Sequence, residues 1–192
     1  MATRLSAQDR REQILQAAAR AFSRGGMAGT STDDVAREAG VSQPYVVQKF
    51  GTKIDLFEEV FDRATAAVLA RFAVELNDPE KAESAQVWDN LGAAYSELVA
   101  DRDVLMVLSQ GFCAGAAYPQ ISRSAREFMS TLFTTLITRT GCTPQHAREF
   151  IANGMLLNAL LSMDAMGHVN DDPGLASLAE CARECDFGGS AI

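Results

Sequence analysis

Apolar side chains recur every three or four residues along most of this chain, a spacing that predicts helices. Ile14, Leu15, Ala18 and Phe22 show this spacing before Gly25-Gly26, and similar patterns follow each later break. No stretch alternates apolar and polar residues convincingly, as a half-buried strand would. The fold is therefore predicted to be all-helical, with helices at about 7–26, 32–39, 43–50, 52–76, 80–100, 103–116, 120–140, 144–167 and 173–185.

The stretch from residue 30 to residue 57 predicts two short helices joined by a tight turn. Ser31 and Asp34 have the spacing of a capping box, in which each side chain accepts a hydrogen bond from the backbone of the other residue. Gly40 can take the left-handed conformation that ends a helix, and Ser42 is expected to cap the next one. Two short helices with a glycine in the turn are typical of a helix-turn-helix, whose second helix can enter the major groove of DNA.

Two further capping boxes are expected to begin the flanking helices, Ser6 with Asp9 and Thr52 with Asp55. In the second helix of the motif, Val46 and Phe50 are expected to face the core, which leaves the other side chains for DNA. Glutamine amides can pair with adenine, and proline or tyrosine rings can pack on thymine methyl groups. Hydroxyl groups, free backbone N–H groups and a lysine at helix starts suit phosphate, although each hydroxyl can equally be a simple cap. The predicted DNA-binding residues are Thr30, Ser31, Thr32, Ser42, Gln43, Pro44, Tyr45, Gln48, Lys49 and Lys53.

The order of several short motifs resembles the DNA-binding domain of TetR-family regulators. These motifs are Ile14 to Ala18, Thr30 to Ala36, Ala39 to Ser42 and Phe50 to Leu56. The resemblance implies a three-helix DNA-binding domain over residues 1–51 and a helical ligand-binding and dimerisation domain over residues 52–192. The chain departs from the family pattern at Val47 and Lys49, where tyrosines that contact phosphate are usual. Lys49 can restore such a contact through its charge, whereas Val47 cannot.

The predicted helix that begins at Pro144 is apolar on nearly all sides, so it is expected to be buried on more than one side. One face can serve the core of the body and another a partner subunit, as the resemblance to TetR-family dimers also implies. The alternative is a central helix buried within a monomer. The predicted dimer contacts are Phe150, Leu157, Leu161, Leu175, Leu178 and Ala182.

Large apolar residues with a few polar neighbours can also line a ligand pocket in the body. The candidates are Trp88, Tyr95, Met106, Phe112, Phe128, Met129, Phe133 and either Asn153 or Asn158. Each of them can equally be ordinary core, because large apolar side chains are normally inside. Gly111 and Gly115 each cost about 1 kcal/mol against alanine in a helix, which leaves close packing, a kink or a pocket wall as explanations.

The net charge of −8 looks unfavourable for a DNA-binding protein until it is divided along the chain. Residues 1–53 carry eight Lys or Arg against five acids, whereas the remainder carries nine against twenty. The charge is thus +3 on residues 1–53, the head, and −11 on the remaining residues, the body. This asymmetry favours a head that binds a polyanion. We find neither an apolar run long enough for a membrane span nor an apolar signal core, so a cytoplasmic protein without membrane contact is expected.

Little in the sequence points to catalysis. It contains two histidines, His146 and His168, and lacks the phosphate-loop, nucleophile-elbow and His-Glu-x-x-His motifs. Cys181 and Cys185 share a helix face, so a thiol redox sensor is an alternative, but no nearby ligand completes a tetrahedral metal site. No enzyme activity, metal or cofactor is expected. The first hypothesis is a homodimeric repressor that binds a palindromic double-stranded DNA operator and is released by a small-molecule inducer; another alternative is a protein-interaction module.

Overall fold

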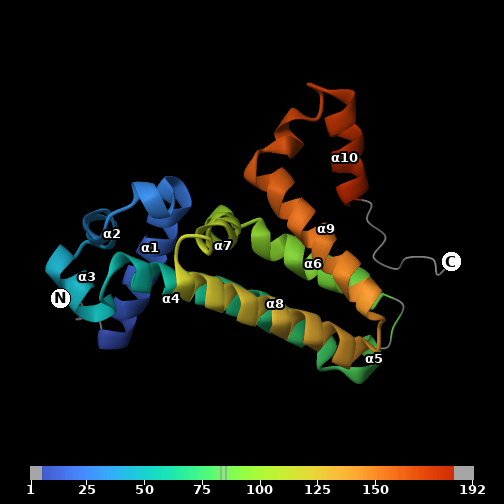
Figure 1. The fold of residues 1–192 in the computed structure, drawn as a ribbon, viewed down its shortest axis with the longest axis horizontal. Helices are drawn as coiled ribbons and strands as arrows, with labels where there is room; N and C mark the ends of the chain where they lie inside the picture. Colours follow the sequence, from blue (N-terminus) through green and yellow to red (C-terminus); the bar gives the residue numbers. More distant parts are fainter. Residues whose placement is uncertain (1–5, 83, 85, 184–192) are drawn as a thin grey trace, which may run out of the picture. The chain divides into compact units, whose positions relative to one another are not determined.

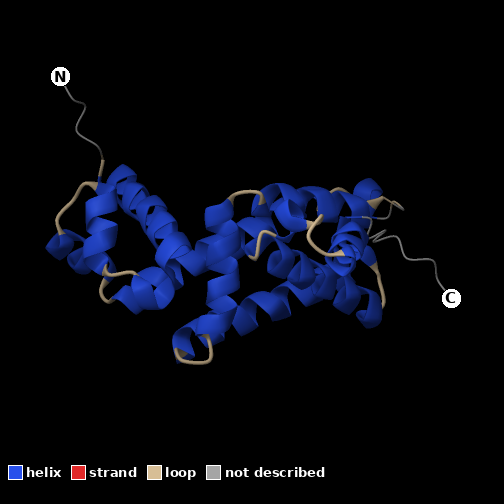
Figure 2. Ribbon diagram, turned by 90° about the horizontal axis from the view of Figure 1, so that it is seen from above, coloured by secondary structure: helices blue, strands red, loops and turns tan. Residues whose placement is uncertain are grey.

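The computed structural model describes residues 6–82, 84 and 86–183, and every regular element in this part of the chain is a helix (Figure 1 and Figure 2). The prediction of an all-helical fold is confirmed. In chain order the elements are α1 (Ala7–Gly29), α2 (Thr32–Ala39), α3 (Gln43–Phe50), α4 (Lys53–Leu76), α5 (Pro79–Ala82), α6 (Val87–Val99), α7 (Arg102–Ala114), α8 (Pro119–Thr140), α9 (Pro144–Ser162), the 3₁₀ helix η1 (Ala165–His168) and α10 (Pro173–Arg183).

The chain divides into two compact units. The first comprises residues 1–65 and 102–125, and the second comprises residues 66–101 and 126–192. Both α4 and α8 therefore cross the boundary between the units. The boundary that we expected at residue 51 separates a DNA-binding function from ligand binding and dimerisation, and it stays a prediction.

The first unit is built on the packing of α1 against α2 and α7, and of α2 against α3 (Figure 1). Its core contains Ile14, Phe22, Val35 and Val46, all of which are fully buried. Phe57 completes this core from the start of α4, with its ring edge-on to Phe22 at a centroid distance of 5.0 Å. The short helices α2 and α3 are thus held in place by tertiary packing, because eight residues are too few to form a stable helix alone.

The local signals for helix starts are largely confirmed. Ser6 with Asp9 and Ser31 with Asp34 form complete capping boxes, and Gly40 ends α2 in the left-handed conformation with φ 66°. The expectation for Ser42 was wrong, because its side chain makes no capping hydrogen bond although it stands at the N-cap of α3. Pro44 in the first turn lacks an N–H that would need capping.

Helix α1 continues beyond the glycine pair at which we expected it to end. Gly26 has φ 65° and ψ 178°, which breaks the helix, and a further turn follows to Gly29. The chain is held on each side of this break by a side chain of the first unit. The Lys53 ammonium donates to the carbonyl of Met27 (Nζ to O, 2.7 Å), and the Gln110 amide on α7 donates to the carbonyl of Ser23 (3.4 Å).

Two of the predicted helices in the body are interrupted. The helix expected over residues 80–100 is divided into α5 and α6. The helix expected to run from Pro144 to residue 167 ends at Ser162, because Asp164 takes a left-handed conformation with φ 55° and the chain continues as η1. Aspartate tolerates this conformation better than most residues, but an α-helix cannot continue through it.

Among the described helices, none is by itself long and apolar enough to cross a membrane. The pair α7 and α8 meets that criterion only in combination, and the two helices are bent by 115° at their junction.

Candidate nucleic-acid interface

Helix α3 is anchored through one side and exposed on the other. Val46 is fully buried and Phe50 is 8% exposed, so the two residues face the core as the sequence predicted. The Arg11 guanidinium lies over the Phe50 ring at 4.5 Å from its centroid, which fixes the C-terminal end of the helix. The exposed side chains of α3 are Pro44, Val47, Gln48 and Lys49.

Gln43 joins the first turn of α3 to the first turn of α2. Its side-chain amide donates to the hydroxyl of Thr32 (Nε2 to Oγ1, 3.2 Å), and both residues are half-buried. This hydrogen bond uses one of the two amide N–H groups and leaves the amide oxygen as an acceptor. The bond therefore restricts the orientation of Gln43, which favours a directional contact over a flexible one.

Lys49 is the uncommitted cation of α3. Its ammonium lies 5.8 Å from the centroid of the Tyr45 ring, and within the described part of the chain it forms neither a hydrogen bond nor an ion pair. Tyr45 itself is half-buried. An exposed ammonium above an aromatic ring keeps most of its freedom, since such an exposed contact is worth only about 0.5–1 kcal/mol.

Most other cations near the motif already have carboxylate partners. Within the first unit the ion pairs are Arg11 with Glu59, Arg20 and Arg24 with Glu38, Arg37 with Asp33 and Asp34, and Arg63 with Glu12. Hydrogen bonds from the side chain of Arg20 and then Arg24 hold the pKa of Glu38 below its ordinary value. Much of the positive charge that the sequence assigns to this region is therefore neutralised locally.

The capping residues at the start of α2 bind one another through local hydrogen bonds. The Ser31 hydroxyl donates to the Asp34 carboxylate (2.6 Å) and accepts from the Asp34 N–H (3.1 Å). These hydrogen bonds hold the pKa of the Asp34 carboxyl below its ordinary value. Thr30 is 4% exposed, and its hydroxyl donates to the carbonyl of Ala21 (3.1 Å). Of the phosphate contacts expected here, the Thr30 hydroxyl is thus corrected to a structural role, because it is buried and already bonded.

Lys53 has a similar internal contact but keeps donors to spare. Its ammonium carries three N–H groups, and the contact with the Met27 carbonyl uses one of them. The exposed Thr52 and Asp55 form the third expected capping box directly beside it (Asp55 N–H to Thr52 Oγ1, 3.2 Å; Thr52 N–H to Asp55 carboxylate, 2.8 Å). Lys53 therefore stands at the capped start of α4 with part of its binding capacity unused.

Comparison with known proteins places this motif in a family. The model for bacterial regulatory proteins of the tetR family matches residues 14–60, which contain most of α1, all of α2 and α3, and the start of α4. The HTH-type transcriptional regulator AcrR of Shigella flexneri is 38% identical over 60 residues, which are 31% of this chain and 28% of that protein. Residues 14–60 of this chain thus match the TetR family.

Solved structures, one of them described as a TetR-family member, extend the likeness beyond the motif. A member from Streptomyces coelicolor A3 has a TM-score of 0.68 at 26% identity, with 81% of this chain and 89% of that chain covered. The multidrug binding protein EbrR in complex with imidazole has a TM-score of 0.63 at 26% identity, with 81% and 82% covered. A transcriptional regulator from Rhodococcus sp. Rha1 shares the fold at 24% identity, with a TM-score of 0.67 over 92% of this chain and 93% of that one.

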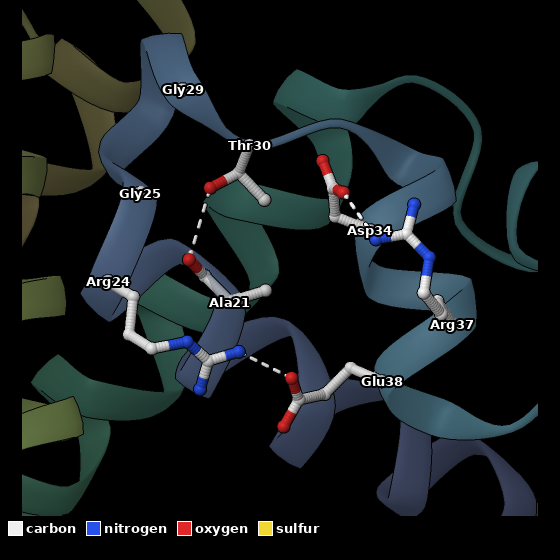
Figure 3. A pocket seen from close by; sticks show the side chains of 8 residues that line it. All are labelled: Ala21, Arg24, Gly25, Gly29, Thr30, Asp34, Arg37 and Glu38. Atoms are coloured by element: carbon white, nitrogen blue, oxygen red, sulfur yellow. Dashed lines mark hydrogen bonds and ion pairs between the residues drawn. The ribbon is translucent and has the colours of Figure 1, made fainter.

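A shallow groove of about 470 Å³ lies between the end of α1 and α2 (Figure 3). The lining residues are Ala21, Arg24, Gly25, Gly29, Thr30, Asp34, Arg37 and Glu38. Dashed contacts in Figure 3 join Arg24 to Glu38, Arg37 to Asp34 and Thr30 to Ala21. Because these charged and hydroxyl groups already bind one another, the groove is a structural junction between the two helices.

The residues that we expected to line a ligand pocket are distributed over both units. Met106 and Phe112 belong to the first unit, where Phe112 packs edge-on against Phe61. The others belong to the second unit, and they are Trp88, Tyr95, Phe128, Met129, Phe133 and Asn153. Nothing in the fold tests their assignment to a pocket, which stays a prediction.

Within the second unit, Tyr95 sits in a polar contact surrounded by aromatic rings. Its hydroxyl donates to Asn158 (Oη to Oδ1, 2.9 Å). Whether Asn153 or Asn158 lines a ligand pocket stays a prediction. Phe72 lies edge-on to both Tyr95 and Phe150, and Trp88 packs on Phe150 at 5.2 Å. Burial raises the pKa of Tyr95 to about 12, against the opposing effect of the Asn158 hydrogen bond.

The residues that we expected at a dimer interface differ in exposure. Phe150 is 6% exposed and packs within its own chain, so its ring is corrected to a core residue. Leu157, Leu161, Leu175 and Ala182 are half-buried and Leu178 is 42% exposed. Met155 on α9 and Met163 directly after it, which are not among the predicted dimer contacts, are 41% and 63% exposed.

The cysteines give little sign of a metal or redox site in the described residues. Cys113 and Cys181 are exposed and Cys142 is half-buried, all as free thiols, whereas Cys185 lies outside the described residues. A search of the described residues finds no group of three or more His, Cys, Asp or Glu that could hold a metal ion.

Proposed function

We propose that this chain is a homodimeric transcriptional repressor whose α2 and α3 bind a palindromic DNA operator and whose body binds a small-molecule inducer. The observation that carries the proposal is the state of α3: buried Val46 and Phe50 fix the helix, while Gln48 and Lys49 are exposed. A rigid helix that presents an amide and a cation matches what the major groove requires, namely directional base contacts and neutralised phosphate.

The exposed apolar residues of the C-terminal helices support a homodimer. Met155 on α9, Met163 directly after it and Leu178 on α10 are each exposed. In a two-fold dimer the same exposed apolar residues of both copies can cover one another. Such a dimer also presents two copies of α3 to a palindrome. We infer an operator with half-sites about 34–36 Å apart, which is one turn of DNA.

The EbrR structures support the ligand response. That protein is described as multidrug binding and is seen with imidazole and with malachite green. By analogy, we propose that the body of this chain binds an organic inducer that favours a conformation unable to match the operator. Operator and inducer must then weaken each other's equilibrium binding by the same factor.

The first experiment is selection from random double-stranded DNA with the full-length protein. Enrichment of an inverted repeat, bound by a particle with the mass of a dimer, would support the proposal and supply the operator. If protein that is folded and dimeric enriches no sequence, the proposal fails and the protein-interaction alternative gains support.

The second experiment tests the role of Lys49 on that operator. Each Lys49 that neutralises one phosphate releases about 0.9 counterion, so Lys49→Ala in a dimer should reduce the slope of log K against log salt by about 2. Lys49→Arg keeps the charge and should keep the slope. Arg71→Ala, which removes an exposed cation paired with Glu97 on the body, is the matched control and should leave the slope unchanged. An unchanged slope in Lys49→Ala would refute the assigned role.

A further inference from the structure

The surface of α3 contains an apolar side chain that neither the fold nor the contacts described above explain. Val47 is 41% exposed, whereas its neighbour Val46 is fully buried. In a helix, residues three and four apart share a face, so Val47 lies beside Pro44. Gln48 and Lys49, the next two residues, are also exposed. Val47 is thus an apolar point on the surface that we propose meets DNA.

The chemistry of valine restricts what Val47 can contact there. It has no donor or acceptor, so it can bind neither a phosphate nor the polar edge of a base. The C5-methyl group of thymine is the apolar feature that the major groove displays. Valine is branched at Cβ and strongly prefers one rotamer in a helix, so its two methyl groups are held in place before binding.

The position of Val47 within α3 also suits base contact. It is the fifth of eight residues, with the buried anchors Val46 and Phe50 on either side of it in sequence. A side chain at the centre of a fixed helix is placed more precisely than one at a fraying end. Gln48, directly after it, can pair with an adenine. Val47 and Gln48 together can therefore recognise an A·T-containing step, Val47 through a thymine methyl group and Gln48 through an adenine.

We propose that Val47 is a specificity-determining residue that recognises one thymine methyl group in each operator half-site. This inference rests on the proposed function, because it requires the exposed face of α3 to enter the major groove. It goes beyond that proposal by assigning base preference to a side chain that cannot contribute to electrostatic affinity.

The test removes the methyl group from the DNA instead of altering the protein alone. In the selected operator, each thymine is replaced in turn by deoxyuridine, which lacks only the C5-methyl group. Loss of one buried methyl contact should weaken binding about fourfold for one half-site, and about fifteenfold when both half-sites are substituted. The loss that depends on Val47 is expected at one symmetry-related pair of positions.

The matching protein variant is Val47→Ala, measured on both forms of the operator. It should bind the thymine operator more weakly than wild type and should no longer distinguish thymine from deoxyuridine at that position. Val74→Ala, at a 59% exposed valine of α4, is the control and should keep the full sensitivity. Because each protein is compared with itself on two DNAs, a general loss of folded protein cancels.

Three results would overturn the inference alone: wild-type binding that is indifferent to deoxyuridine throughout the half-site, an operator half-site without thymine, or a Val47→Ala protein that keeps the wild-type sensitivity. Failure of the folded dimer to bind any specific DNA would instead remove the proposed function and this inference together. The two kinds of failure are therefore distinguishable.

Discussion

Gly111 in α7 is the position where the structure makes its sharpest stability prediction. A Cβ atom added to Gly111 would lie 2.1 Å from Cδ2 and 2.2 Å from Cε2 of Phe61, far inside van der Waals contact. Phe61 is fully buried and its ring packs edge-on against Phe112 at 5.7 Å. Close packing is therefore the explanation for a glycine in this helix, among those that the sequence left open.

Two opposing effects set the size of the change in Gly111→Ala. Alanine is favoured over glycine in a helix by about 1 kcal/mol. Forcing a methyl group into a packed core costs about 1–3 kcal/mol, and the depth of this clash places it at the upper end, about 3 kcal/mol. The free energy of unfolding should therefore fall by about 2 kcal/mol, and the melting temperature by about 4–8 °C for a chain of this size.

Gly154→Ala is the matched control, because it makes the same change inside another helix. A Cβ atom there would lie 3.6 Å from Cε1 of Tyr95, which is ordinary contact. This variant should gain up to about 1 kcal/mol from helix propensity without a clash. The assay is thermal and urea unfolding of both variants beside wild type, with the helix signal followed by circular dichroism.

Equal stability of Gly111→Ala and Gly154→Ala would contradict a clash at residue 111. If Gly111→Ala is destabilised, a second substitution tests whether contact with the Phe61 ring is the cause. Phe61→Ala removes Cγ, Cδ2 and Cε2, the three ring atoms nearest the added methyl group, so Gly111→Ala should destabilise the Phe61→Ala protein less than it destabilises wild type. Equal destabilisation in both backgrounds would contradict a clash with this ring.

Two further predictions concern hydrogen bonds. Tyr95→Phe leaves the carbonyl oxygen of Asn158, which is 5% exposed, without its donor, so the free energy of unfolding should fall by about 1–3 kcal/mol in urea titration. The folded pKa of Tyr95 is raised to about 12, so the contribution of its protonated hydroxyl to the free energy of unfolding is complete below about pH 10 and is lost as the pH rises towards 12. The melting curve of Tyr95→Phe should lack this alkaline loss of stability. The folded pKa of Asp34 is instead lowered, first by the Ser31 hydroxyl, so its contribution is present above about pH 4 and is lost as the pH falls further. Asp34→Asn should therefore show a shallower loss of melting temperature on acidification, and an unchanged acid profile would count against the capping role.

The sequence predicts contacts well when both partners are close along the chain. The Ser31 and Asp34 capping box could be predicted because its two residues are three apart, and so could the buried positions of α3. The bonds of Gln43 with Thr32, Lys53 with Met27 and Tyr95 with Asn158 join residues 11, 26 and 63 apart. Their geometry depends on how helices pack, which no local pattern determines. For the same reason Thr30 looked available to phosphate although its hydroxyl is buried.

The paired charges of the first unit also change how its affinity for DNA should be understood. Exposed ion pairs contribute only about 0–1 kcal/mol, so an arginine such as Arg24 could turn from its carboxylate to a phosphate at little cost to folding. Glu38 would keep its ion pair with Arg20 but lose the one with Arg24, and repulsion between its less compensated charge and the negatively charged DNA backbone would cancel part of the gain. Lys49 forms no ion pair with a carboxylate of the described residues. Phosphate affinity should therefore depend more on this single lysine of each protomer than on any of the paired arginines, although the arginines are more numerous.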